Sequence, residues 1–341
     1  MLLNSSTNKS LKYMLAIATL LTTIILFTAC KSEPAETVKK EEFHFNTICT
    51  IEIRDLPKDK ADKAIVEAFK QCKEYDNLFS RTVEGSDIYK INHSNGKPVE
   101  VSNDTIEMLR FAIDTSKKSG GRFDISIGKL ADLWNFTAEN PKKPADNDIL
   151  KLIPKVDYNN IKIEGNTVTL KDPDQWLDLG AVAKGFVADK LDKSLRKAGT
   201  NSALINLGGN LSTIGNAQPD KPWYIGIEKP YSDRKEAVGA VKLTDQTIVT
   251  SGVYERYFEE NGVKYHHILD PKTGYPVKTD IVSISIISKA GNSMKCDTYA
   301  TVGLLMGSEK AAEFLDKIDD IEYCIIKTND GIIPSKGFKM E

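Results

Sequence analysis

The chain has 341 residues, of which 40% are hydrophobic and 28% are charged, and its formal net charge is −2. This composition is that of an ordinary globular protein, long enough for one large or two modest domains. The charge is close to zero and no basic stripe with interleaved aromatic residues occurs, which argues against a nucleic-acid partner and leaves small phosphorylated ligands.

The first thirty residues have the pattern of an export signal. Lys9 and Lys12 precede an apolar run over residues 14–27, and small residues lead to Cys30. This arrangement is typical of secretory signals, and the cysteine resembles the lipobox of bacterial lipoproteins. We expect a signal peptide over residues 1–29, a lipid on Cys30, and a location on the bacterial cell membrane, facing outside the cytoplasm. A plain signal peptide or a single membrane anchor is the alternative, although the run is short for a spanning helix.

The polar stretch that begins after Cys30, "KSEPAETVKKEE", predicts a flexible tether over residues 30–42. The folded domain is then expected over residues 43–341. Its cysteines form no CxxC pair and no regular framework, so they predict buried thiols rather than a zinc site or a disulfide scaffold. These cysteines are Cys49, Cys72, Cys296 and Cys324.

Periodicity predicts the first elements of this domain. Residues 43–53 alternate as a strand does, and residues 61–72 carry apolar side chains at helical spacing. A helix over about residues 104–119 should stop at the glycine pair that follows it. Two alternating runs around Gly165-Asn166 predict a hairpin.

The second half of the chain mixes strands and helices. A helix should end at Gly199, and a pair of helices should occupy residues 297–318, with a break at Gly307. Strands are expected in the segments "SALINLG", "WYIGIEKP", "AVGAVKLTDQTIVTSG" and "IVSISIISKA". Because strands and helices do not alternate regularly, we expect an α+β fold with mixed or antiparallel sheets and packed helices.

The stretch "WLDLGAVAKGFVADKL", residues 176–191, predicts a buried strand, a turn of small residues and a helix. Its glycines, Gly180 and Gly185, have the spacing that begins a P-loop, but the lysine precedes the second glycine, so this is not a nucleoside-triphosphate loop. A helix N-terminus with Lys184 beside it can still hold an anion. Asp178 could accept hydrogen bonds from the same ligand. A tight connection with a solvated lysine is the alternative.

A second group of residues is "KCDTYATVGLLMG". Asp297 is expected at a helix N-cap, and Thr301 follows four residues later on the same helical face. A carboxylate and a hydroxyl that converge in this way suit Mg²⁺, which prefers oxygen ligands and keeps phosphate oxygens in its shell. An aspartate cap with a threonine packed below it is the alternative.

Three further segments could contact a ligand. In "YHHILDPKTGYPV", the neighbours His266 and His267 should point to opposite faces of a strand, so they do not form a metal site. Gly208 and Gly209, followed by Asn210, allow a flat or phosphorylated ligand to approach the backbone. The third segment, "GGRFDISIGKL", places Phe123 and Asp124 beside a turn.

Taken in order, these segments resemble the ApbE family of FAD:protein FMN transferases. The resemblance extends from Phe43 to the C-terminus and includes "FSRTVEGSDIYKIN", "RFDISIG", "DLGAVAKGFVADKL", "INLGGN", "TSGVYERYF", "HILDPKTGYP" and "CDTYATVGLLMG". It implies an ApbE-like (T-fold-like) architecture of two subdomains. It also implies a Mg²⁺-dependent transfer of FMN from FAD to a threonine or serine of an exported acceptor flavoprotein, with release of AMP.

The resemblance assigns roles residue by residue. Lys184 and Asp178 would hold the FAD diphosphate, and His267 would assist proton transfer, with Asp270 as another candidate base. The implied metal ligands are Ala181, Asp297 and Thr301, with Ala300 between them. The implied flavin contacts are Phe45, Thr82, Arg122, Phe123, Asp124 and Leu269. The sequence departs from the family at Phe45-Asn46-Thr47, usually "MGT", and at Thr82, often aromatic.

Two alternatives remain at this point. With water as the acceptor, the protein would be an FAD pyrophosphatase that yields FMN and AMP. A lipid-tethered protein that only binds and delivers a flavin would have the same export signal. The second alternative predicts Mg²⁺-independent flavin binding and no AMP release, and Asp297, Thr301 and Lys184 argue against it.

Overall fold

The computed structural model describes residues 36–232 and 236–341. The expected signal peptide and the lipidation of Cys30 lie outside these residues. Within them, no helix is both long and apolar enough to cross a bilayer.

An eight-stranded sheet forms the centre of the molecule, and each neighbouring pair of its strands is antiparallel. In spatial order the strands are β1 (Val38–His44), β2 (Thr47–Ile53), β6 (Ala203–Leu207), β7 (Asn210–Ile214), β10 (Gln246–Gly252), β13 (Ile281–Lys289), β14 (Ile321–Lys327) and β15 (Ile332–Pro334). The sheet and its helices confirm the α+β prediction.

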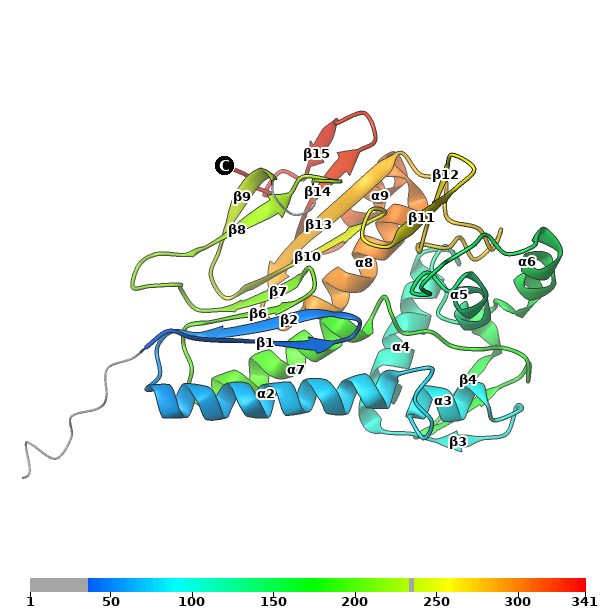
Figure 1. Ribbon diagram of the computed structural model, residues 1–341, viewed down its shortest axis with the longest axis horizontal. Coiled ribbons are helices and arrows are strands. Elements are labelled where there is room, and N and C mark those ends of the chain that lie inside the picture. The colour runs from blue at the N-terminus through cyan, green and yellow to red at the C-terminus, as the bar shows by residue number, and fades with distance from the viewer. Residues whose placement is uncertain (1–35, 233–235) are drawn as a thin grey trace, which may run out of the picture.

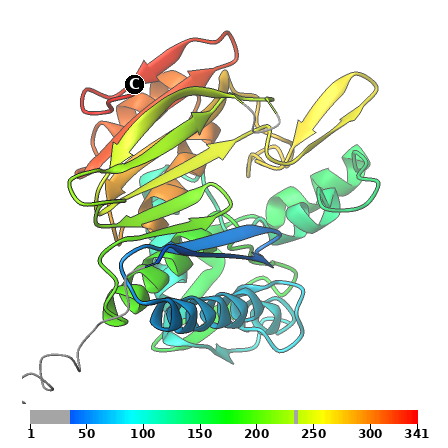
Figure 2. The same cartoon turned by 60° about the vertical axis from the view of Figure 1, so that its left-hand side comes forward.

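Helices cover one face of this sheet, as Figures 1 and 2 show. They are α2 (Lys58–Phe79), α7 (Ala183–Lys197), α8 (Ser293–Met306) and α9 (Ser308–Leu315). A ribbon of β8 (Trp223–Glu228) and β9 (Ala237–Leu243) packs on the opposite face, over a smaller core that includes Trp223, Ile248 and Ile287. Side chains alternate along each strand, so neighbouring residues of β10 point to opposite faces of the sheet. Ile248 packs in this smaller core, and Val249 packs in the main core under the helices.

A second group of elements lies beside one end of the sheet (Figure 1). It contains α3 (Asp87–Asn92), β3 (Val99–Glu100), α4 (Asn103–Lys118), α5 (Gly128–Trp134), α6 (Asp146–Leu152), η1 (Ile153–Lys155), η2 (Tyr158–Asn160), β4 (Ile161–Glu164) and β5 (Thr167–Leu170). The hairpin of β11 (Tyr257–Glu260) and β12 (Val263–His266) closes on α5 through a third core. In this core Trp134 donates from Nε1 to the carbonyl of Gly274 at 2.8 Å.

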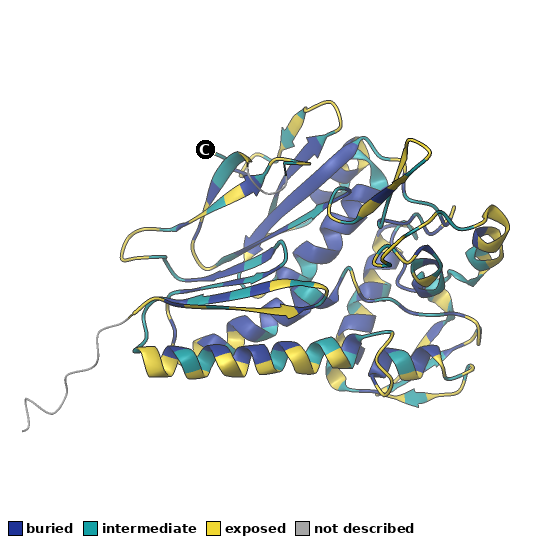
Figure 3. Ribbon diagram, viewed as in Figure 1, coloured by how far each residue is buried: buried dark blue, intermediate teal, exposed yellow. Residues whose placement is uncertain are grey.

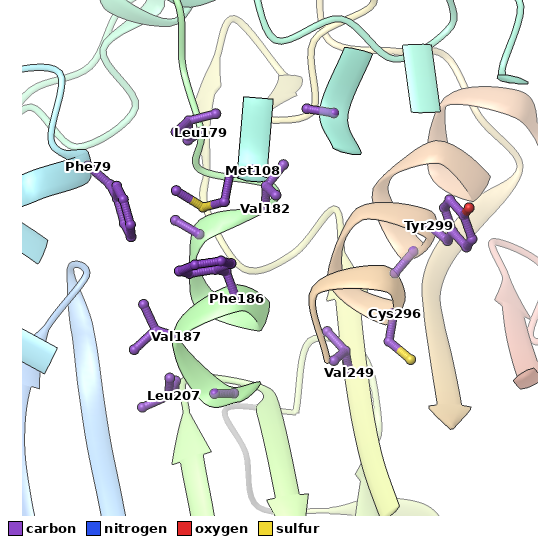
Figure 4. Packing of buried hydrophobic residues seen from close by; sticks show 14 of the residues in the cluster. Phe79, Met108, Leu179, Val182, Phe186, Val187, Leu207, Val249, Cys296 and Tyr299 are labelled. Atoms are coloured by element: carbon purple, nitrogen blue, oxygen red, sulfur yellow. The ribbon is translucent and has the colours of Figure 1, made fainter. Parts of the chain in front are cut away.

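Helix periodicity places the buried side chains correctly. The apolar face predicted for residues 61–72 is the buried face of α2, and the yellow and blue stripes of α2 in Figure 3 show this division. The rings of Phe79 and Phe186 pack edge to face, with their centroids 5.7 Å apart. Figure 4 shows both rings near Met108, around the first turns of α7. The four described cysteines are buried free thiols, as expected.

Four local expectations are wrong. Residues 43–53 are not one strand: Phe45 and Asn46 have φ of 52° and 56° and form a two-residue turn between β1 and β2. The expected tether over residues 30–42 is also too long. Strand β1 begins at Val38, so residues 38–42 belong to the sheet.

The other two corrections concern the site. Residues 176–179 are extended but join no sheet strand, and a single bridge links Trp176 to Ile127. Asp297 is not an N-cap of its own helix, because α8 already begins at Ser293.

Candidate active site

A cavity opens between the carboxyl-terminal ends of β6 and β10, the start of α7 and the second group of elements. Its space, which includes open solvent at the mouth, is about 1260 Å³. Its wall is assembled from segments that lie between Arg81 and Leu305 in the sequence.

The start of α7 and the start of α8 meet at the deep wall of this cavity. The Asp297 carboxylate accepts a hydrogen bond from the Gly185 backbone N–H at 2.9 Å, and its other oxygen lies 3.9 Å from Lys184 Nζ. In return, Asp189 of α7 accepts from the N–H groups of Ser293 and Met294, at 2.8 and 3.0 Å. Each helix thus caps the N-terminus of the other, satisfying donors that have no partner within a helix.

Gly185 allows this close approach. A Cβ atom built at this position would lie 2.4 Å from the carbonyl oxygen of Ser293 and 2.6 Å from the Cα of Met294. Both neighbours are backbone atoms, so they cannot move aside as a side chain does. The close packing of α7 against α8 therefore requires glycine at this position.

Lys184, Asp297 and Thr301 bring charge and oxygen ligands to the same wall. Asp297 and Thr301 are one helical turn apart on α8, and both face the cavity. The Asp297 side chain is buried. The Thr301 hydroxyl donates a hydrogen bond to the backbone carbonyl of Asp297, at 3.4 Å. Among the described residues no group of three or more His, Cys, Asp or Glu side chains could hold a metal ion by itself.

Asp178 has protein partners at the edge of the cavity. Its carboxylate accepts from the Gly180 N–H at 2.7 Å and from Arg81 Nε at 3.0 Å. Arg81 also donates to Asp132 on α5, at 2.5 Å. Asp178 therefore shapes the turn before α7 and holds the Arg81 guanidinium on the cavity wall.

His267 lies on the cavity wall, and its side chain is partly buried. Burial, together with the positive charge of Arg256, lowers its pKa to about 3, so the ring is neutral at physiological pH. Its Nδ1 is 3.2 Å from the backbone carbonyl of Arg256. A carbonyl can only accept, so Nδ1 carries the proton and Nε2 is left as an unprotonated base.

The turn between β6 and β7 provides close backbone contact and an unpaired amide. Gly208 has φ of 66° and lies against the Thr47 side chain. Asn210 follows at the start of β7, fully buried on the cavity wall, and neither Oδ1 nor Nδ2 has a hydrogen-bond partner among the described residues. Such a buried amide needs a partner, which a bound ligand can supply.

The structure brings nine of the expected site residues to this cavity. They are Phe123, Asp124, Asp178, Ala181, Lys184, His267, Leu269, Asp297 and Thr301. Asp124 is held in place by the N–H groups of Ser126 and Tyr158, at 2.8 and 2.9 Å, and burial raises its pKa.

Five expected residues lie off this wall: Phe45, Thr82, Arg122, Asp270 and Ala300. Phe45 forms the β1–β2 turn and donates its N–H to Asp76. Asp270 accepts from the Lys272 N–H at 2.8 Å and shapes the turn after His267. Ala300 is three residues from Asp297 and is buried in the main core instead.

The residue-by-residue prediction missed Arg81, Arg256 and Asn210 as wall residues. The two arginines stand in "FSRTVEGSDIYKIN" and "TSGVYERYF", the segments that carried the family resemblance. Asn210 closes the glycine turn that had been singled out for backbone contact. Both arginines are distant in sequence from residues 176–191, so no local pattern linked them to the predicted phosphate site.

The chain is similar to several known proteins. A family model described as the ApbE family matches residues 45–325. An FAD:protein FMN transferase of Klebsiella pneumoniae is 34% identical over 278 residues, which cover 80% of this chain and 85% of that protein. An FAD:protein FMN transferase of Treponema pallidum is 30% identical and covers 87% of this chain and 86% of its own length.

Solved structures show the same fold. The ApbE protein of Thermotoga maritima superposes with a TM-score of 0.80 at 28% identity, covering 88% of this chain and 97% of that one. The flavin transferase ApbE of Vibrio cholerae gives a TM-score of 0.76 at 28% identity, over 89% of this chain and 97% of that chain.

Proposed function

This chain belongs to the ApbE family, and on that premise we propose that it transfers FMN from FAD to a threonine or serine hydroxyl of another protein and releases AMP. The observation that carries the proposal is the meeting of the starts of α7 and α8, where Lys184, Asp297 and Thr301 face one cavity. The positive charge of Lys184 on this wall suits the diphosphate of a dinucleotide.

In this reaction the acceptor oxygen forms a bond with the FMN phosphorus, and the bond from that phosphorus to the bridging oxygen breaks. AMP leaves with the bridging oxygen, and the hydroxyl proton passes to a base. Negative charge grows on the phosphate oxygens and on AMP. Lys184 offsets this charge from the wall, and Arg81, held by Asp178, provides a second cation at the edge of the cavity.

His267 is the group best placed to take the proton. Its Nε2 is unprotonated because Nδ1 donates to the Arg256 carbonyl and because the ring remains neutral. The same hydrogen bond orients the ring toward the cavity. The Asp270 carboxylate, which holds the Lys272 N–H in a turn, is the weaker candidate.

The residues on the wall fit Mg²⁺. The Asp297 carboxylate, the Thr301 hydroxyl and the Ala181 carbonyl are oxygen donors, and Mg²⁺ commonly takes one or two carboxylates, with phosphate oxygens and waters completing its shell. One Asp297 oxygen accepts from the Gly185 N–H, and the other, 3.9 Å from Lys184 Nζ, is the one that would hold such an ion. When bound, Mg²⁺ would neutralise charge on the diphosphate.

The activity is tested by incubating the full chain with FAD, Mg²⁺ and exported proteins from cells that lack this gene product. Covalent flavin fluorescence on one protein, with an added FMN by mass and AMP in equal amount, is the expected result. AMP and free FMN without protein labelling would instead indicate a pyrophosphatase. Flavin binding that needs no Mg²⁺ and releases no AMP would indicate a delivery protein and overturn the proposal.

We also infer from the export signal that the protein is lipidated on Cys30 and faces outside the cytoplasm, where an exported acceptor would meet it. The support is the sequence before Cys30. Replacing Cys30→Ala should abolish labelling by a fatty-acid precursor and release the protein from membranes. Membrane retention without lipid labelling would support an uncleaved anchor instead.

A further inference from the structure

Two surface hollows adjoin the active-site cavity. The first, which we call the tyrosine groove, lies between β8 and the end of the main sheet and is lined by Tyr224, Tyr231, Tyr254 and Tyr257. It shares Gly208, Gly209, Thr250 and Glu255 with the cavity. The groove therefore opens onto the same glycine turn that borders the site.

The second hollow lies on the other side of the mouth and is lined by Phe43, Phe136 and Arg256, among others. It shares Phe136 and Arg256 with the cavity, and it shares Glu255 and Tyr257 with the tyrosine groove. We call the two hollows together the channel; Glu255 lines both of them and the cavity as well. Arg256, whose carbonyl holds His267, lines the second hollow and the cavity.

Exposed aromatic side chains are concentrated in this channel. Among the described residues, the aromatic side chains classed as exposed are Phe43, Tyr224, Tyr231 and Tyr257, with exposed fractions of 69%, 61%, 48% and 43%. All four line one or other of the two hollows. Aromatic residues are enriched in protein interfaces, where they contribute much of the binding energy.

The aromatic wall is ordered before any partner binds. The rings of Tyr231 and Tyr257 meet edge to face, 5.9 Å apart, and Tyr231 also lies 5.7 Å from Tyr254. The Lys264 ammonium sits over Tyr231 and Tyr257, at 4.6 and 5.4 Å from their centroids. These contacts come from two elements and a loop, so the wall loses little freedom on binding.

We propose that this channel binds an extended segment of the acceptor protein and directs its hydroxyl into the cavity beside His267. This inference rests on the proposed function, which requires a second macromolecular substrate at a cavity already filled by FAD. In an extended segment, alternate side chains point to opposite sides, so one side chain can enter the cavity while its neighbours lie along the aromatic walls.

The test uses the exported protein that becomes flavinylated in the experiment above. A double variant, Tyr224→Ser with Tyr257→Ser, removes two exposed rings that do not line the FAD cavity. We expect the KM for the acceptor to rise about tenfold or more, since truncating an interface anchor commonly costs more than a factor of five. The kcat at saturating acceptor, the Kd for FAD and the thermal midpoint should change little.

The matched control is Val66→Ser, which removes a side chain of 57% exposure from α2, a helix that contributes no residue to either hollow. It should leave the acceptor KM unchanged. An unchanged KM in the tyrosine double variant, or a loss of kcat at constant KM, would overturn the docking proposal alone. Wild-type protein that labels no acceptor and releases no AMP would overturn the proposed function, and the docking proposal with it.

Discussion

The His267 imidazole is neutral because burial and the nearby charge of Arg256 lower its pKa. His267→Ala should lower FMN transfer about a hundred- to ten-thousand-fold, the range typical of a lost general base. The Kd for FAD should change little. Stopped assays of transfer, with FAD binding measured by flavin fluorescence, test this expectation. Equal transfer rates in variant and wild type would remove the histidine from the mechanism.

The lowered pKa of His267 predicts how the stability of the protein depends on pH. The unfolded histidine titrates near its ordinary pKa of 6.5, whereas the folded one titrates at about 3. Between these values the unfolded state binds more protons, so stability falls as the pH drops from about 6.5 toward 3. His267→Gln should lessen this fall, as measured by urea unfolding at pH 7 and pH 4.5. If the free energy of unfolding fell by the same amount between pH 7 and pH 4.5 in variant and wild type, the His267 ring would be solvated in the folded protein.

The Asn210 carboxamide is buried on the wall without a protein partner. Asn210→Leu should leave the free protein as stable or more stable, because an unpaired buried amide costs about 1–3 kcal/mol. FAD binding should weaken about tenfold, because the ligand loses a partner. Calorimetry and thermal unfolding measure the two effects.

Ser212 provides the control for this variant. It is also buried without a partner and lies two residues further along β7, on the same face, but it does not line the cavity. Ser212→Ala should raise stability without changing the Kd for FAD. Weakened FAD binding in both variants would point to a shift of β7 rather than to a contact made by Asn210.

At the scale of elements, the packing of α7 against α8 depends on Gly185. Gly185→Ala places a methyl group against the backbone of Ser293 and Met294, which should destabilise the protein by about 1–3 kcal/mol and move Lys184 away from Asp297. Urea unfolding and FAD titration should both show the loss. Gly226→Ala on β8 is the control, because a Cβ there would meet only the Ala237 Cβ, at 3.6 Å. Equal stability of both variants would contradict the packing argument.

Local sequence patterns predicted these elements well but misplaced their ends. The buried face of α2 and the hairpin at Gly165 follow from periodicity and turn chemistry, which act over a few residues. The spacing of Asp297 and Thr301 on one helix face was also correct. Asp297 caps α7 rather than α8, however, because its partner N–H belongs to Gly185, 112 residues earlier. No local pattern contains that information.

At the scale of the whole molecule, the cavity exists only when segments between Arg81 and Leu305 are folded together. FAD should therefore bind the native state alone and stabilise it by about 2.7 kcal/mol at a concentration of 100 Kd. Thermal unfolding with and without FAD measures this stabilisation. Lys184→Ala should reduce the shift, and replacing Mg²⁺ by EDTA should reduce it as well. A thermal shift by FAD that neither Lys184→Ala nor EDTA reduces would indicate that FAD binds outside this cavity.

The sequence alone determined the family, the fold class and nine of the residues on the cavity wall, because motif order and short-range spacing are written in consecutive residues. It did not determine how these residues pair. Tertiary structure decided that Arg81 is held by Asp178 across 97 residues and that Asn210 is left unpaired beside the ligand space. It also decided that the exposed aromatic rings converge on the cavity mouth. Such contacts arise only when distant segments pack around a common core, so they depend on the whole chain.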